Sequence, residues 1–190
     1  MEMLKLYDFP QDVIDEANNI YKQLGTHLNR KNHNLKVLFC VYNAYLNLDM
    51  VMDILLLAHK LKIPQKKVKN VFKLCSPIET GYQFKQIRFT IKQYAKLYLD
   101  NINDLSKEQK NIIMNEYVMD IIEKNDNMLV DEKPQSLAAA IIIYFLEKRK
   151  LKDQLIEFKQ KLYRRITTIN PLVITVGNVL NKSIKNYQKN

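Results

Sequence analysis

The residues of this chain most able to do chemistry are its lysines and arginines, and the chemistry they offer is anion binding. The 190 residues include 30 Lys and Arg against 20 Asp and Glu, which gives a formal charge of +10 at pH 7. A positive field of this kind attracts polyanions such as nucleic acid. The alternative is that the charge makes a merely soluble basic surface.

One stretch concentrates this charge. Six lysines lie within fourteen residues: Lys60, Lys62, Lys66, Lys67, Lys69 and Lys73. Lysines of this kind neutralise DNA phosphates without regard to base sequence, and the binding weakens as salt rises. A solvated helix face in a lysine-rich protein is the competing interpretation. We favour phosphate contact, and expect Lys66, Lys67, Lys69 and Lys73 to bind DNA.

A second basic region lies nearer the C-terminus. Its members fall between positions 148 and 165: Lys148, Arg149, Lys150, Lys152, Lys159, Lys161, Arg164 and Arg165. Hydroxyl groups and helix N-termini also donate hydrogen bonds to phosphates. We therefore expect a second set of DNA-binding residues here: Arg164, Arg165, Thr167, Thr168 and Lys182.

The common catalytic and metal-binding patterns are missing from the sequence. Cys40 and Cys75 stand far apart with no CxxC, and the three histidines do not complete a ligand set at zinc spacing. Gly-rich phosphate loops, HExxH and GxSxG are absent as well. We expect no enzyme, no metal site and no cofactor.

Membrane insertion and secretion are not indicated either. The longest apolar run, Leu137 to Leu146, has ten residues, roughly half of the ~20 that a spanning helix needs. The N-terminal residues lack the apolar core of a secretory signal. We expect an intracellular, reducing compartment in which both thiols are free.

The elements that must position the basic residues all have helical periodicity. Gln11 to Leu28 and Asp49 to Leu61 carry apolar residues at three-four spacing, LKVLFCVYNAYLN is almost entirely apolar, and Pro64 opens PQKKVKNVFKLC. No strand-like alternation is present. The fold class expected for the chain is all-α.

The second half follows the same pattern. TIKQYAKLYLDNIN precedes a helix that starts with the capping box Ser106 to Gln109, and DEKPQSLAAAIIIYFLEKRK is a Pro-led helix apolar enough to be buried all round. LKDQLIEFKQKLY is amphipathic, and Asn170-Pro171 is expected to start the last helix. These helices would carry the second basic region.

The two halves repeat one another. Cys40-Val41-Tyr42 matches Ile142-Ile143-Tyr144 at an offset of 144 − 42 = 102, and the segment from Ile63 matches the one from Ile169 at 169 − 63 = 106. In each half a buried helix is followed by an amphipathic helix, a tight turn and a final helix. The chain is therefore expected to be a tandem duplication.

These segments resemble a known family. PQSLAAAIIIY is similar to the second cyclin repeat of transcription factor IIB, FCVYNAY and LKIPQKKVKNVFKL resemble its first repeat, and TTINPLVITVGNVL resembles its closing helix-turn-helix. The likeness covers the chain from about Ile14 to Ile184. The richness of the sequence in Lys, Asn and Ile suggests the branch of the family found in large DNA viruses such as African swine fever virus. The resemblance implies two tandem five-helix cyclin-type repeats, residues 1–102 and 103–190, the second ending in a helix-turn-helix with the turn ITTIN.

The resemblance also implies a function. Family members clamp promoter DNA bent by the TATA-binding protein and help recruit RNA polymerase, in the nucleus or, for a virus, in a cytoplasmic viral factory. They recruit polymerase through a zinc ribbon and a loop that this sequence does not contain. We accordingly expect promoter DNA and the TATA-binding protein as partners, with polymerase contacted through a region absent here.

The last helix departs from the family pattern. By resemblance, Leu172 and Thr175 occupy an exposed face that reads an upstream promoter element in some members, with Ile174 buried between them. Those members carry Arg in place of Thr175, and threonine cannot grip guanine edges bidentately. Gly177 also weakens a helix interior by roughly 1 kcal/mol relative to Ala. Both departures favour binding to the DNA backbone over reading of its sequence.

A kinase-activating cyclin is the alternative function. It shares the helical bundle but presents a hydrophobic groove to a kinase helix instead of a basic face to DNA. The absence of Trp, which the cyclin-box signature normally contains, and the positive charge both argue against it.

Overall fold

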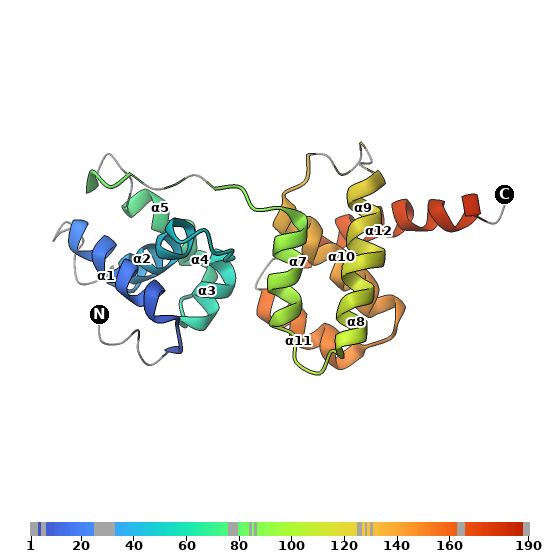
Figure 1. Cartoon of the computed structure of the whole chain (residues 1–190), viewed down its shortest axis with the longest axis horizontal. Helices are drawn as coiled ribbons and strands as arrows, with labels where there is room; N and C mark the ends of the chain where they lie inside the picture. The colour runs from blue at the N-terminus through green and yellow to red at the C-terminus, as the bar shows by residue number, and fades with distance from the viewer. Residues whose placement is uncertain are drawn as a thin grey trace. The chain divides into compact units, whose positions relative to one another are not determined.

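The chain forms two compact all-helical units, residues 1–88 and 89–190 (Figure 1). The computed structural model describes the chain apart from residues 1–3, 5, 6, 25–32, 76–79, 84, 86, 125, 126, 128, 130, 163–165 and 188–190, and describes only the backbone of 74, 166, 167 and 182–187. No strand occurs in the part described, which confirms the expected all-α class. No described helix is both long and apolar enough to cross a membrane.

The first unit is built around one buried helix. It comprises α1 (Gln11–Gln23), α2 (His33–Asn47), α3 (Ile54–Lys60), α4 (Gln65–Val68) and α5 (Val71–Leu74), and α2 packs against α1, α3 and α5. The polar residues of α2 are held inside by specific contacts. The Lys36 ammonium lies 4.0 Å from the centre of the Tyr21 ring, and Asn43 donates to the Phe39 carbonyl at 2.9 Å.

The helix predicted over Asp49 to Leu61 is shorter, because two aspartates end one helix and start the next. Asp49 adopts a left-handed conformation with φ 55°, and the next amide, Met50 N, donates to the Tyr45 carbonyl at 2.8 Å. This closes α2 in a Schellman motif. The Asp53 carboxylate then accepts from Leu55 N at 2.8 Å and caps α3.

The second unit is built around α10 (Pro134–Lys148), which packs against α7 (Ile91–Asp100), α11 (Lys152–Leu162), α12 (Ile166–Tyr187) and the π-helical segment η3 (Ile113–Val118) (Figure 1). η3 runs without a break between α8 (Lys107–Ile112) and α9 (Met119–Lys124). The capping box of Ser106 and Gln109 is present, as the sequence predicts. The Pro-led helix is also confirmed, because Leu137 to Ile143 are all buried.

The division between the units differs from the expected one. The first repeat expected from the sequence ends at residue 102 and includes α7, whereas the structure divides the chain after Arg88. The reason is packing: Tyr94, Tyr98 and Leu99 of α7 are buried, and α7 packs against α10. The Tyr98 ring lies 5.8 Å from that of Phe158 in α11.

The central helices of the two units correspond closely. The last residues of α2 and α10, Asn47 and Lys148, are 148 − 47 = 101 positions apart. Lys150 follows α10 with φ 56°, as Asp49 follows α2, and Leu151 N donates to the Leu146 carbonyl at 2.9 Å. The helix boundaries therefore give an offset of 101, one less than the offset from the sequence match.

Gly177, expected from the sequence only to weaken its helix, is required by packing. A Cβ atom at this position of α12 would lie 2.8 Å from Cε2 and 3.2 Å from Cδ2 of Tyr144 in α10. The Tyr144 hydroxyl donates to Asn181 Oδ1 at 3.1 Å, one turn further along α12. The glycine thus lets the tyrosine ring lie directly on the helix backbone.

Candidate nucleic-acid interface

The lysine cluster of the first unit is exposed. Lys66 and Lys67 in α4, Lys69 in the following turn and Lys73 in α5 all have solvent-exposed side chains. The predicted single helix from Pro64 is divided at Asn70, whose amide donates to the Lys67 carbonyl three residues back at 3.0 Å. Such a bond tightens the chain into a 3₁₀-type turn.

No acidic residue lies between the lysines of this cluster along the chain. Residues 54–78 contain six lysines and neither Asp nor Glu. Within the described residues, none of Lys66, Lys67, Lys69 and Lys73 forms an ion pair. Buried Val68, Val71 and Cys75 anchor the segment from the other side. The charges are therefore fixed to the unit by packing and open to a ligand.

Two lysines of the second basic region are occupied by contacts within the protein. Lys159 pairs with Glu147 at 3.0 Å, and Lys161 pairs with Glu157 at 2.5 Å while donating to the Asn101 carbonyl at 2.7 Å. The hydrogen bond from Lys161 lowers the pKa of Glu157. These lysines are consequently less available for phosphates than those of α4 and α5.

Several predicted DNA-binding residues lie outside the described part of the chain. Arg164 and Arg165 belong to that group, and the side chains of Thr167 and Lys182 in α12 do too. Thr168 is described, and it is exposed.

The expected turn ITTIN is helical, because α12 begins at Ile166 instead of Asn170. Pro171 lies inside the helix. Ile169, ahead of the proline, is only 3 % exposed, so burial of this side chain supports the helix before Pro171.

The face of α12 was predicted incorrectly. Leu172 is buried at 6 % exposure, and Ile174, expected to be buried, is 66 % exposed. Thr175 is partly buried, and its hydroxyl donates to the Pro171 carbonyl at 3.1 Å. Buried Val173, Val176 and Leu180 set this register. Leu172 therefore belongs to the core, and Thr175 has its hydroxyl proton engaged.

Between Thr168 and Asn181, where the side chains of α12 are described, its exposed face carries no charge. It consists of residues spaced by about one helical turn: Thr168, Pro171, Ile174, Asn178 and Asn181. No charged residue occurs between positions 166 and 181. Three of these surface residues were not predicted from the sequence: Ile174, Asn178 and Asn181. The spacing of the apolar residues from Ile169 to Leu180 was the signal that could have revealed them.

The two thiols are buried in the first unit. Burial raises the pKa of Cys40 to about 12 and that of Cys75 to about 11, so both remain protonated thiols at neutral pH. Among the described residues, no group of three or more His, Cys, Asp or Glu side chains could hold a metal ion.

The chain was compared with protein-family models, curated proteins and solved structures, and none of them matches it.

Proposed function

We propose that this chain is the two-repeat core of a transcription factor IIB-like initiation factor, which binds promoter DNA together with a TATA-binding protein. The observation that carries the proposal is the exposed lysine cluster of α4 and α5, where four lysines stand in a segment without acids. Its work is equilibrium binding, in which lysines displace counterions from DNA phosphates. The proposal includes recruitment of RNA polymerase, through a region that is absent from this sequence.

The correspondence of the two units supports the proposal. Each is built around a buried central helix that ends in the same left-handed cap, at Asp49 and at Lys150, as a tandem repeat would require. The shape of such a core would select DNA already bent by a partner, because the partner supplies the free energy of bending. Affinity for free DNA is therefore expected to be weak, and to rise when the TATA-binding protein is present.

The uncharged face of α12 adds a second support. A helix that enters the major groove contacts base edges with amide and hydroxyl groups and thymine methyl groups with apolar side chains. Asn178 offers an amide that can pair with adenine, and Ile174 offers methyl groups. This face would contact the bases of A·T-rich DNA. The sequence alone led us to expect contacts with the DNA backbone only.

The lysine cluster is tested by the triple substitution Lys66→Ala, Lys67→Ala and Lys69→Ala. Each lost phosphate contact lowers the salt slope of DNA binding by about 0.9, so the triple variant should lower it by up to about 2.7. Affinity should fall for every DNA sequence alike, because phosphate contacts carry no sequence information. Fluorescence anisotropy over a salt series gives both quantities.

The matched control replaces three exposed lysines elsewhere, Lys22, Lys92 and Lys133, and should leave the slope near that of the parent protein. An unchanged slope in the Lys66, Lys67 and Lys69 variant would remove these residues from the interface. Absence of DNA binding in the parent protein would instead favour the cyclin-like, kinase-binding alternative.

A further inference from the structure

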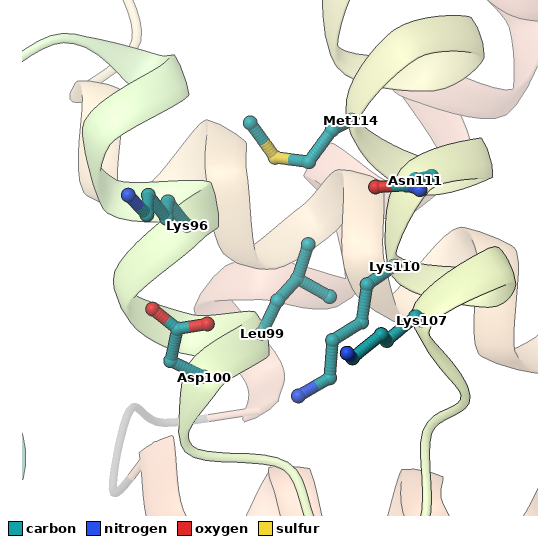
Figure 2. Close-up of a pocket in the computed structure, with 7 residues that line it drawn as sticks. All are labelled: Lys96, Leu99, Asp100, Lys107, Lys110, Asn111 and Met114. Atoms are coloured by element: carbon teal, nitrogen blue, oxygen red, sulfur yellow. The ribbon is translucent and has the colours of Figure 1, made fainter.

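A cavity of about 320 Å³ opens between α7 and the α8–η3 segment of the second unit. Figure 2 shows Leu99 of α7 and Met114 of η3 pointing into the space between these segments, and Lys110 reaching across toward the end of α7. The cavity is separate from the residues assigned to DNA binding above.

The cavity is an open groove between these helices, and its floor is apolar and adaptable. Leu99 is only 2 % exposed, and it is held by the packing of α7 against α10. Met114 is partly buried, and its unbranched thioether side chain adapts to the shape of whatever lies against it. Met114 lies in the π-helical segment, and π-helical insertions occur frequently at functional sites.

The rim of the groove is basic. Lys96, Lys107 and Lys110 line it with Asp100 as its single acid, so its formal charge is 3 − 1 = +2. In the described part of the chain, none of these four groups has an ion-pair partner. The α8 N-terminus is closed by its capping box, so the lysines remain as the principal groups for an anion.

We propose that this groove binds a short acidic segment of a partner protein, which inserts one large apolar side chain between Leu99 and Met114 and places carboxylates against the lysines. Amphipathic segments dock into helical grooves in this way, with apolar anchors for affinity and flanking charges for specificity. A nucleic-acid backbone fits less well, because it has no group for the apolar floor and Asp100 would repel its phosphates. The proposal does not rest on the DNA-binding function.

The test uses a fluorescein-labelled short peptide of Asp and Glu residues around a central Phe, with fluorescence anisotropy on the full chain. One companion peptide replaces Phe with Ser, and another replaces the acids with Asn and Gln. Both should bind roughly tenfold more weakly, because one loses the buried anchor and the other loses the charge pairs. Equal binding of the Phe and Ser peptides would overturn the proposal, since it would mean adsorption to the lysines alone.

Two variants locate the site. Lys107→Glu with Lys110→Glu should weaken peptide binding by about tenfold or more, whereas the control Lys133→Glu, at an exposed position before α10, should change it by less than about twofold. Equal weakening by both would refute the location. Affinity of the double variant for double-stranded DNA should fall by less than about twofold, because we assign that binding elsewhere. A larger loss would identify the groove as a nucleic-acid surface and reject the peptide.

A second measurement uses the parent protein alone and needs no variant. Backbone amide signals of residues 96–100 and 107–114 should shift when the Phe peptide is added to the parent protein, and shift much less with the Ser peptide. Shifts confined to other residues would place the peptide outside the groove and end the proposal.

Discussion

The substitution Gly177→Ala tests the packing of α10 against α12 most sharply, because two opposing effects meet at one atom. Alanine favours a helix interior over glycine by about 1 kcal/mol, so helix propensity alone predicts a more stable protein. The new Cβ, however, would lie 2.8 Å from the Tyr144 ring, and relieving such overpacking costs typically about 1–3 kcal/mol. Moving the ring also endangers its 3.1 Å hydrogen bond to Asn181, which contributes about 0.5–1 kcal/mol.

The net expectation is a loss of about 1–2 kcal/mol in the free energy of unfolding of the second unit. For a unit of about 100 residues this lowers Tm by about 5–10 °C. The chain has no Trp, so far-UV circular dichroism is the suitable signal for thermal or urea unfolding. The decisive comparison repeats Gly177→Ala in a Tyr144→Ala background, where the obstructing ring is gone and the substitution should stabilise by about 1 kcal/mol. A stabilising effect in the parent protein would refute the packing argument.

The remaining predictions concern the α12 register and the buried thiols. Leu172→Ala should cost about 2–5 kcal/mol of stability because the side chain is buried, whereas Ile174→Ala should change it by less than about 0.5 kcal/mol; comparable costs in urea unfolding would contradict the register. The pKa of Cys40 is raised from 9.0 to about 12, so its contribution to stability should be complete below pH 9 and lost as pH rises toward 12. Cys40→Val should flatten the pH dependence of the urea midpoint in that window, and an unchanged dependence would argue against the burial of this thiol.

Local signals explain why some elements could be predicted from the sequence. Ser106 and Gln109 start a helix because their side chains satisfy amides within the same turn, and Pro134 opens α10 because a first helical residue needs no amide proton. The continuous apolar run of α10 requires burial on all sides whatever surrounds it. Such features depend only on neighbouring residues, and the structure confirms them.

Other features depend on contacts between distant residues. Asn170-Pro171 is a plausible helix start, yet burial of Ile169 extends α12 past it. By helix propensity alone, Gly177 destabilises its helix. It is needed because the Tyr144 ring packs against it in the folded unit. Tertiary packing overrides propensity in both cases.

The candidate sites divide in the same way. The lysines of α4 and α5 could be predicted, because four charges in a short acid-free segment must reach the surface. The groove of Leu99 and Met114 could not, because α7 and η3 come together only in the folded unit and no periodicity indicates a cavity. Periodicity shows which side of a helix is buried, and it does not show which helices pack together.

The central claim is most directly tested by fluorescence anisotropy with an AT-rich promoter duplex, with and without a cognate TATA-binding protein, at a low and a high salt concentration. We predict weak binding that decreases with salt, and a large increase in affinity when the TATA-binding protein is present, because that partner supplies the bent DNA. Binding of equal strength with and without the partner, or no binding in either case, would contradict the assignment as an initiation-factor core.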